Sequence, residues 1–112
     1  MDRIRRGSVV VVSIPGDYGK PRPALVVQSD LFNETHPSVT VVPITSTLLD
    51  APIFRVTVEP SPGNGLRSIS QLMVDKVMTV SRSRLRQTIG HFEDDVLLRV
   101  SRALTVWLGI AA

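Results

Sequence analysis

The 112-residue sequence contains no cysteine. Disulfide bonds, zinc–thiolate sites and thiol chemistry are therefore excluded. The two histidines, His36 and His91, lie far apart and have no H-x-x-H or H-E-x-x-H partner. This spacing does not predict a metal site, and no other pattern in the sequence indicates a cofactor.

Long apolar runs are also missing from the chain. No segment reaches membrane-spanning length, and the charged residues 1–6 are not followed by the apolar stretch of a signal peptide. We therefore expect a cytoplasmic protein. The length fits one domain over residues 1–112, and a hydrophobic content of 43% is enough for a real core.

Acidic residues are few and unevenly placed. Three of the ten, Glu93, Asp94 and Asp95, are adjacent, so that residues 1–92 hold 11 Lys and Arg against 7 Asp and Glu. A basic surface of this kind suits a phosphate-rich partner such as nucleic acid. Ordinary solubility accounts for the same charge balance, and charge alone slightly favours it.

The first two-thirds of the chain has the pattern of short strands separated by Pro and Gly turns. In one of them Phe54, Val56 and Val58 alternate with Arg55 and Thr57, as in a half-exposed strand. The expected strands are 8–14, 24–28, 39–44, 53–58, 66–74 and 76–80. Several short strands of this kind predict a compact twisted sheet or small barrel.

The end of the chain changes to helical spacing, which predicts a helix over 93–108 and a mainly β fold with one C-terminal helix. Its apolar stripe consists of Val96, Leu97, Val100, Ala103, Leu104, Trp107 and Leu108. Acidic residues at its start suit the helix dipole, and Phe92 with Leu97 could form a hydrophobic staple. The stripe should pack on the sheet, although a dimer interface is the alternative for Trp107 and Leu108.

The most unusual segment is 19–27, in which Pro21 and Pro23 bracket Arg22. Each proline fixes its own φ, and Pro23 also pushes Arg22 towards an extended conformation. A guanidinium held in this way can bind a phosphate through two parallel hydrogen bonds, and Lys20 adds a second cation. The alternative is an arginine that opens a strand and pairs with a carboxylate.

Two further polar groups could contact a nucleic acid. The hydroxyls of Thr45 and Ser46 follow an expected strand and could bind a phosphate or ribose, or instead cap a helical turn. Arg82, Arg84 and Arg86 recur at every second residue. In an extended segment they would share one face and form a track for a phosphate backbone, or a charged edge that deters aggregation.

At this point the residues carry a resemblance to the MazF/PemK (Kid) family, the toxins of bacterial toxin–antitoxin pairs. Arg22-Pro23-Ala24-Leu25-Val26-Val27 is similar to the family's R-P-[AV]-L-[VI]-[VI] signature. The segments 6–10, 42–46 and 75–80, and finally 90–92 together with 103–110, are similar to further family segments, in the same order along the chain. Any one of these matches is weak, whereas five in the right order are strong.

The resemblance implies an SH3-like barrel, a homodimer, and metal-independent, sequence-selective cleavage of single-stranded RNA. It also implies a cognate antitoxin of the MazE kind, whose tail covers the RNA groove. Arg22 falls on the family's active-site arginine and Thr45 on its active-site hydroxyl residue, with Ser46 beside it. The base is open between Asp75, Asp17 and His36.

Several positions depart from the family pattern. The loop over 15–21 is shorter than usual, and Met73 stands where the PemK/Kid branch has an arginine. Lys76 and Met78 replace the usual Gln and Arg after the acidic position. If Asp75 is the base, it lacks those neighbours.

Two rival functions stay open. The same barrel occurs in CcdB-like toxins, which poison DNA gyrase without nuclease activity, and residues 107–110 resemble their terminal W-G-I. In this chain, however, Leu108 separates Trp107 from Gly109. The other rival is a binding module that has kept the fold and lost the activity.

Overall fold

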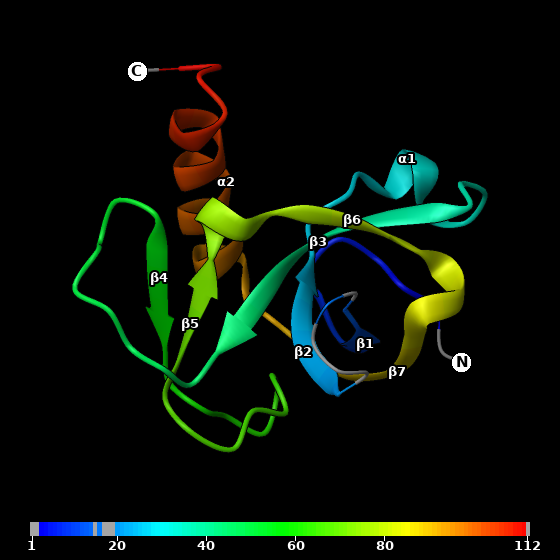
Figure 1. The fold of residues 1–112 in the computed structure, drawn as a ribbon, viewed down its shortest axis with the longest axis horizontal. Coiled ribbons are helices and arrows are strands. Elements are labelled where there is room, and N and C mark those ends of the chain that lie inside the picture. The colour runs from blue at the N-terminus through cyan, green and yellow to red at the C-terminus, as the bar shows by residue number, and fades with distance from the viewer. Residues whose placement is uncertain (1–2, 15, 17–19, 112) are drawn as a thin grey trace.

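The computed structural model describes residues 3–14, 16 and 20–111. Its strands are β1 (Ser8–Ser13), β2 (Pro21–Val26), β3 (Ser38–Thr45), β4 (Arg55–Val58), β5 (Ser70–Met73), β6 (Met78–Ser81) and β7 (Leu85–His91). The helices are α1 (Asp30–Asn33) and α2 (Asp94–Trp107), and the single 3₁₀ turns are η1 (Val74–Lys76) and η2 (Arg82–Arg84) (Figure 1). Within these described ranges no helix is both long and apolar enough to cross a membrane.

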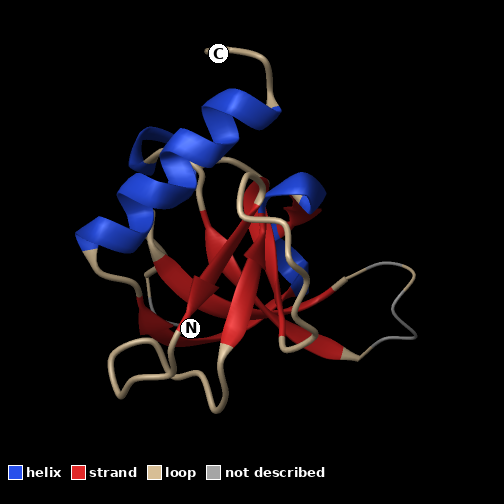
Figure 2. Cartoon of the chain, turned by 90° about the vertical axis from the view of Figure 1, so that its left-hand side faces the viewer, coloured by secondary structure: helices blue, strands red, loops and turns tan. Residues whose placement is uncertain are grey.

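The strands form one antiparallel sheet in the order β4-β5-β3-β2-β1-β7, and β6 also pairs with β3. The long strand β3 is shared because its first half pairs with β6, whereas Ile44 and Thr45 at its end pair with β5. The sheet therefore splits at β3 and curls, while α2 lies across one side of it (Figure 2). The mainly β fold with one C-terminal helix is confirmed, with α1 as an additional single turn.

Two hydrophobic clusters lie on opposite faces of the central strands. One cluster fills the curl of the sheet and includes Val10, Val12 and Val26. The other lies between the sheet and α2 and includes Val9 and Leu25. Because β1 and the second half of β2 are largely buried on both faces, residues 9–12 and 24–26 are continuous apolar runs rather than alternating ones.

The helix prediction is confirmed almost to the residue. Glu93 is the N-cap of α2, and the helix ends at Trp107. Phe92 and Leu97 pack in the same cluster, as expected for a hydrophobic staple. Val96 and Val100 are buried against the sheet, so that this part of the apolar stripe belongs to the core.

Strand β7 was not predicted, and the segment 82–86 differs from the expectation. Arg82–Arg84 form the 3₁₀ turn η2, so the continuous extended segment that would set the three arginines on one face does not form. The chain has to turn here because β6 pairs with β3 whereas β7 pairs with β1. Of these arginines, Arg86 alone lies in a strand, β7.

Candidate functional site

Arg22 and Thr45 lie on the same face of the sheet at the ends of two neighbouring strands. Strand β2 pairs with β3 in a register that sets Ala24 opposite Pro43. Continued by two residues, this register places Arg22 opposite Thr45, and the period of two keeps both on the face of Ala24 and Pro43. Two residues that are distant in the sequence thus come to neighbouring positions where the pairing of β2 with β3 ends.

Two cavities flank this pair, and Arg22, Ile44 and Thr45 line both. The first, which we call the methionine cavity, has a volume of about 470 Å³. Its other lining residues are Ile14, Pro43, Met73, Lys76 and Met78. The second, which we call the polar cavity, has a volume of about 490 Å³, and Ser46, Arg67, Ser68, Ser70 and Gln87 are among its lining residues.

The segment after Thr45 is held in place by hydrogen bonds. Thr45 Oγ1 accepts a hydrogen bond from the backbone N–H of Thr47 at 3.1 Å. Gln71, which pairs with Thr45 across β3 and β5, is buried and bonds both the N–H and the carbonyl of Leu49. The Thr45 hydroxyl therefore fixes the bend that ends β3, and the described segment directly after Ser46 contains no helix for either hydroxyl to cap.

Asp75 is held away from the two cavities by an ion pair with Arg55. Arg55 Nε donates to Asp75 Oδ1 at 2.9 Å, and Nη2 donates to Oδ2 at 3.2 Å. The Arg55 side chain is 7% exposed and that of Asp75 is 18% exposed. Its sequence neighbours Met73 and Lys76 line the methionine cavity, whereas Asp75 is turned towards β4. The structure thus separates Asp75 from Arg22 and Thr45.

The other residues singled out in the sequence are distributed as follows. Lys20 is exposed, two residues before Arg22. Arg86 donates from Nε to Ser13 Oγ at 3.0 Å, and Arg84 reaches the Ser13 carbonyl at 3.5 Å. Ser13 pairs with Pro21, so these two arginines lie at the Arg22 end of the sheet.

Arg82 and His36 lie elsewhere. The Arg82 guanidinium donates two hydrogen bonds to the His36 carbonyl. His36 precedes β3, whose far end carries Thr45, so the whole length of an eight-residue strand separates the two. The third candidate base, Asp17, lies outside the described residues. Among the residues described, no group of three His, Asp or Glu side chains is placed to hold a metal ion.

Sequence reasoning missed Arg67 and Gln87, which line the polar cavity. Arg67 follows a turn that is pinned on β7. Buried Asn64 organises this turn by accepting hydrogen bonds from Ser61 N–H and Leu66 N–H. The turn packs so closely on β7 that a Cβ on Gly65 would lie 2.3 Å from the Ile89 carbonyl oxygen. The sequence signal for this part of the site was the segment 60–65, which predicted a turn. It did not predict that the turn packs on β7.

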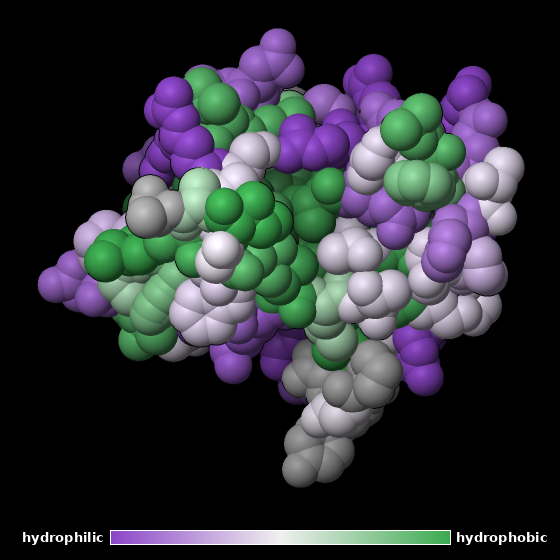
Figure 3. Space-filling model, turned by 90° about the horizontal axis from the view of Figure 1, so that it is seen from above, coloured by the Kyte–Doolittle hydropathy of each residue, from purple (hydrophilic) through white to green (hydrophobic). Residues whose placement is uncertain are grey.

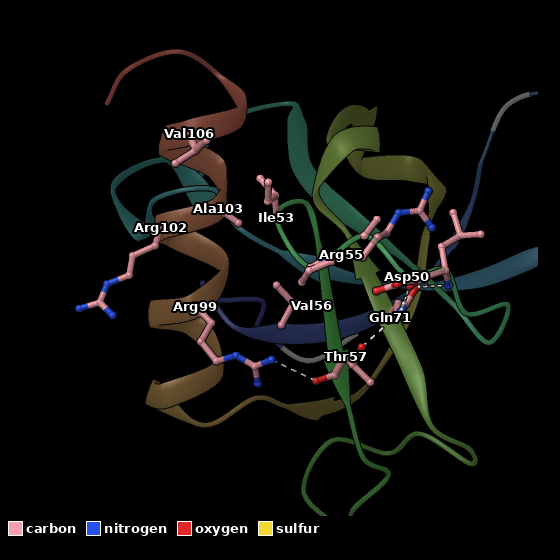
Figure 4. Close-up of a pocket in the computed structure, with 13 residues that line it drawn as sticks. Asp50, Ile53, Arg55, Val56, Thr57, Gln71, Arg99, Arg102, Ala103 and Val106 are labelled. Carbon is pink, nitrogen blue, oxygen red and sulfur yellow. Dashed lines mark hydrogen bonds between the residues drawn. The ribbon is translucent and has the colours of Figure 1, made fainter. Parts of the chain in front are cut away.

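A third cavity of about 480 Å³ lies between α2 and the segment that leads into β4 (Figure 4). Arg55, Arg99 and Arg102 line it together with apolar side chains that include Ile53 and Val106. Around the C-terminal end of α2 the surface is also apolar (Figure 3). Ile53 and Ile110 are each 74% exposed there, and Trp107, which contacts the Phe54 ring, is 49% exposed.

Comparison with known proteins places the whole chain in one group. A probable endoribonuclease MazF of Mycolicibacterium smegmatis is 48% identical over 109 residues, which cover 96% of this chain and 99% of the relative. A mycobacterial endoribonuclease in complex with its cognate antitoxin has the same fold, with a TM-score of 0.82, 22% identity, and coverage of 97% and 98%. The MazE–MazF complex of Deinococcus radiodurans matches with a TM-score of 0.80, 25% identity, and coverage of 99% and 100%.

The fold that the resemblance implied is therefore confirmed. These matches favour the MazF/PemK resemblance over the CcdB-like alternative. Residues 5–108 also match the family described as PemK-like, MazF-like toxin of type II toxin–antitoxin system. With nearly half of its residues identical to a MazF relative along almost all of its length, the chain belongs to this PemK-like, MazF-like family of toxins.

Proposed function

We propose that this protein is the toxin of a toxin–antitoxin pair, acts in the cytoplasm, and cleaves single-stranded RNA without a metal ion. The observation that carries this proposal is the convergence of Arg22 and Thr45 on one sheet face between two cavities. Family membership and the relatives named as endoribonucleases support it. An arginine beside a hydroxyl suits a phosphodiester because one supplies charge and the other a hydrogen bond.

In the proposed reaction the ribose 2′-oxygen attacks the adjacent phosphorus. A bond forms between them, the bond from phosphorus to the 5′-oxygen breaks, and the 2′-hydroxyl proton leaves to a base. The leaving oxygen takes up a proton. Arg22 stabilises the negative charge that builds on the phosphate oxygens, because its guanidinium can bind two of them at once. Thr45, at the end of the neighbouring strand β3, orients the phosphate or the ribose.

Asp75 has a positioning role in this proposal rather than that of the base. Both of its carboxylate oxygens accept hydrogen bonds from Arg55, on the side of η1 that faces β4. The pair anchors η1, whose Lys76 lines the methionine cavity.

The RNA chain is proposed to enter over the basic end of the sheet. Arg84 and Arg86 lie beside Ser13, and Gln87 and Arg67 line the polar cavity next to Arg22. These side chains offer the phosphate contacts that dominate the affinity for nucleic acids. Lys20 and Ser46 extend the same path, whereas Arg82 is held by the His36 carbonyl at a distance from it.

Two protein partners complete the proposal. An antitoxin of the MazE kind would cover the site, as suggested by the MazE–MazF complex of D. radiodurans. A second copy of this chain would cover the apolar surface formed by Ile53, Trp107 and Ile110, because such large apolar side chains gathered in one place mark an interface. We expect a dimer in sedimentation equilibrium, and we expect Ile53→Asp to shift the mass towards that of a monomer.

One experiment separates the nuclease from its rivals. The purified protein is incubated with a long mixed-sequence RNA and a chelator, and in parallel with DNA gyrase and DNA. RNA fragments and unaffected gyrase are expected. Intact RNA with stalled gyrase complexes would support the CcdB-like function instead, and no effect in either assay would indicate a binding module.

A further inference from the structure

The methionine cavity has an unusual combination of walls. Met73 ends β5 and Met78 begins β6, and the single turn η1 between them brings both thioethers to one cavity. Met78 is opposite Val41 of β3, and both methionines are half-buried. Thioether side chains are flexible and polarisable, so they adapt to flat aromatic rings. The cavity is therefore suited to a planar ligand.

The polar groups at this cavity present hydrogen-bond donors. Lys76 has only donors, because an ammonium group carries no acceptor. The Thr45 oxygen accepts the N–H of Thr47, which leaves its O–H to donate. A ligand in this cavity thus contacts apolar walls, and its acceptor atoms can bind the donors of Lys76 and Thr45 at one edge.

We propose that the methionine cavity binds one unstacked nucleobase beside the cleaved phosphate, and that it prefers a base with carbonyl acceptors, uracil or guanine. The inference rests on the proposed function, since Arg22 and Thr45 would hold the adjoining phosphate. Single-stranded RNA is usually recognised through bases that are splayed out of the chain and enclosed by side chains. Cytosine and adenine present an amino group where uracil and guanine present a carbonyl oxygen, so they would set a donor against the donors of this edge.

The polar cavity is a poorer place for that base. Arg67, Ser68 and Gln87 line it, and such side chains suit the charged sugar–phosphate chain. The two cavities meet at Arg22 and Thr45, so one nucleotide can place its base on the methionine side while the chain continues on the polar side. Lys76, Met73 and Met78 would then determine sequence preference, at three positions that depart from the family pattern.

Binding of nucleoside monophosphates tests this assignment without any need for cleavage. The protein is labelled with ¹³C at the methionine methyl groups and titrated with UMP and, as a matched ligand, with CMP. Ring-current shifts of the Met73 and Met78 methyl signals are expected, with an affinity for UMP roughly two- to tenfold above that for CMP. Met73→Leu and Met78→Leu assign the two signals.

Variants of two cationic residues supply the control. Lys76→Met should bring the affinities for UMP and CMP together, because it removes a donor from an exposed position. Arg5→Met, at an exposed cation near the opposite end of β1, should leave their ratio unchanged. Methyl signals that do not move, equal affinities in the wild type, or a preference that survives in Lys76→Met would each overturn the inference, and none of these results would affect RNA cleavage that depends on Arg22. Methyl shifts with UMP preference in a protein that leaves RNA intact would uphold the base site and reject the nuclease.

Discussion

Arg55 and Asp75 form two parallel hydrogen bonds, of 2.9 and 3.2 Å, across the gap between β4 and η1. The Arg55 side chain is almost fully buried, so the pair cannot be broken without leaving a charge in a poorly solvated place. The pair ties the face of the sheet near α2 to the turn that carries Lys76.

Replacement of Asp75 by Ala should therefore lower the free energy of unfolding by about 3 kcal/mol. The double variant Arg55→Met with Asp75→Leu should recover much of this loss, because no unpaired charge remains. Urea unfolding of the three proteins measures the coupling. If the folded double variant cleaves RNA at a rate within roughly tenfold of the wild type, Asp75 only positions η1. A loss of cleavage rate of about 10²-fold or more would indicate that Asp75 is the base.

The close contact between Gly65 and β7 gives a second prediction. Gly65 has a φ of 71°, and a Cβ there would lie 2.3 Å from the Ile89 carbonyl oxygen. Gly109 has a similar φ of 73° but no neighbour within 4 Å, so it is a matched control. Gly109→Ala should cost about 1 kcal/mol of stability from backbone strain alone. Gly65→Ala should cost at least about 1 kcal/mol more, because the turn must move off β7.

The unfolding midpoints in urea and the affinity for a short RNA check this pair of variants. Gly65→Ala should also weaken RNA binding, since Arg67 follows the displaced turn. Equal losses of stability in the two variants would mean that the contact with Ile89 imposes no constraint.

Stability should fall at acidic pH partly through Asp30. The backbone N–H of Arg6, helped by the side chain of Asn33, lowers the pKa of the Asp30 carboxyl below its ordinary value of 3.8. A lowered pKa in the folded state means that the unfolded chain binds the proton more readily. The stabilisation is therefore complete above the unfolded-state pKa and is lost as the pH falls through the lower folded-state value.

Asp30→Ala should reduce the difference in unfolding midpoint between pH 7 and pH 3. The effect should be small because Asp30 is exposed. Asp50→Ala, at another exposed aspartate, provides the comparison. An unchanged pH dependence in Asp30→Ala would show that the Arg6 hydrogen bond does not contribute.

Helical periodicity predicted α2, and short apolar runs between Pro and Gly turns predicted most of the strands, because the buried faces of these elements dominate their sequences. Strand β7 was missed since its segment, which contains Arg86, Gln87 and Gly90, is too polar and Gly-containing to show alternation. It is a strand because it completes the sheet beside β1. Tertiary pairing of this kind cannot be read from local sequence.

The candidate site was only partly predictable for the same reason. Arg22 and Thr45 stood out locally, through their prolines and hydroxyls and through the family resemblance, but their juxtaposition depends on the register of β2 with β3. The sequence left open whether Asp75 is paired with a cation or available for chemistry, since its partner Arg55 lies on another strand. Arg67 reaches the polar cavity through a turn whose docking on β7 no local pattern indicates.

The central claim, that Arg22 supplies the charge for RNA cleavage, is tested most directly by the cleavage rate of one RNA substrate with arginine variants. Arg22→Ala should lower kcat/KM by a factor on the order of 10² or more. The kcat/KM of Arg22→Lys should lie between those of Arg22→Ala and the wild type, because lysine keeps the charge but lacks the planar guanidinium with its two parallel donors. Arg5→Ala, at an exposed arginine near the opposite end of β1, should cleave at the wild-type rate. If folded Arg22→Ala cleaves as fast as the wild type, the assignment of the active site is contradicted.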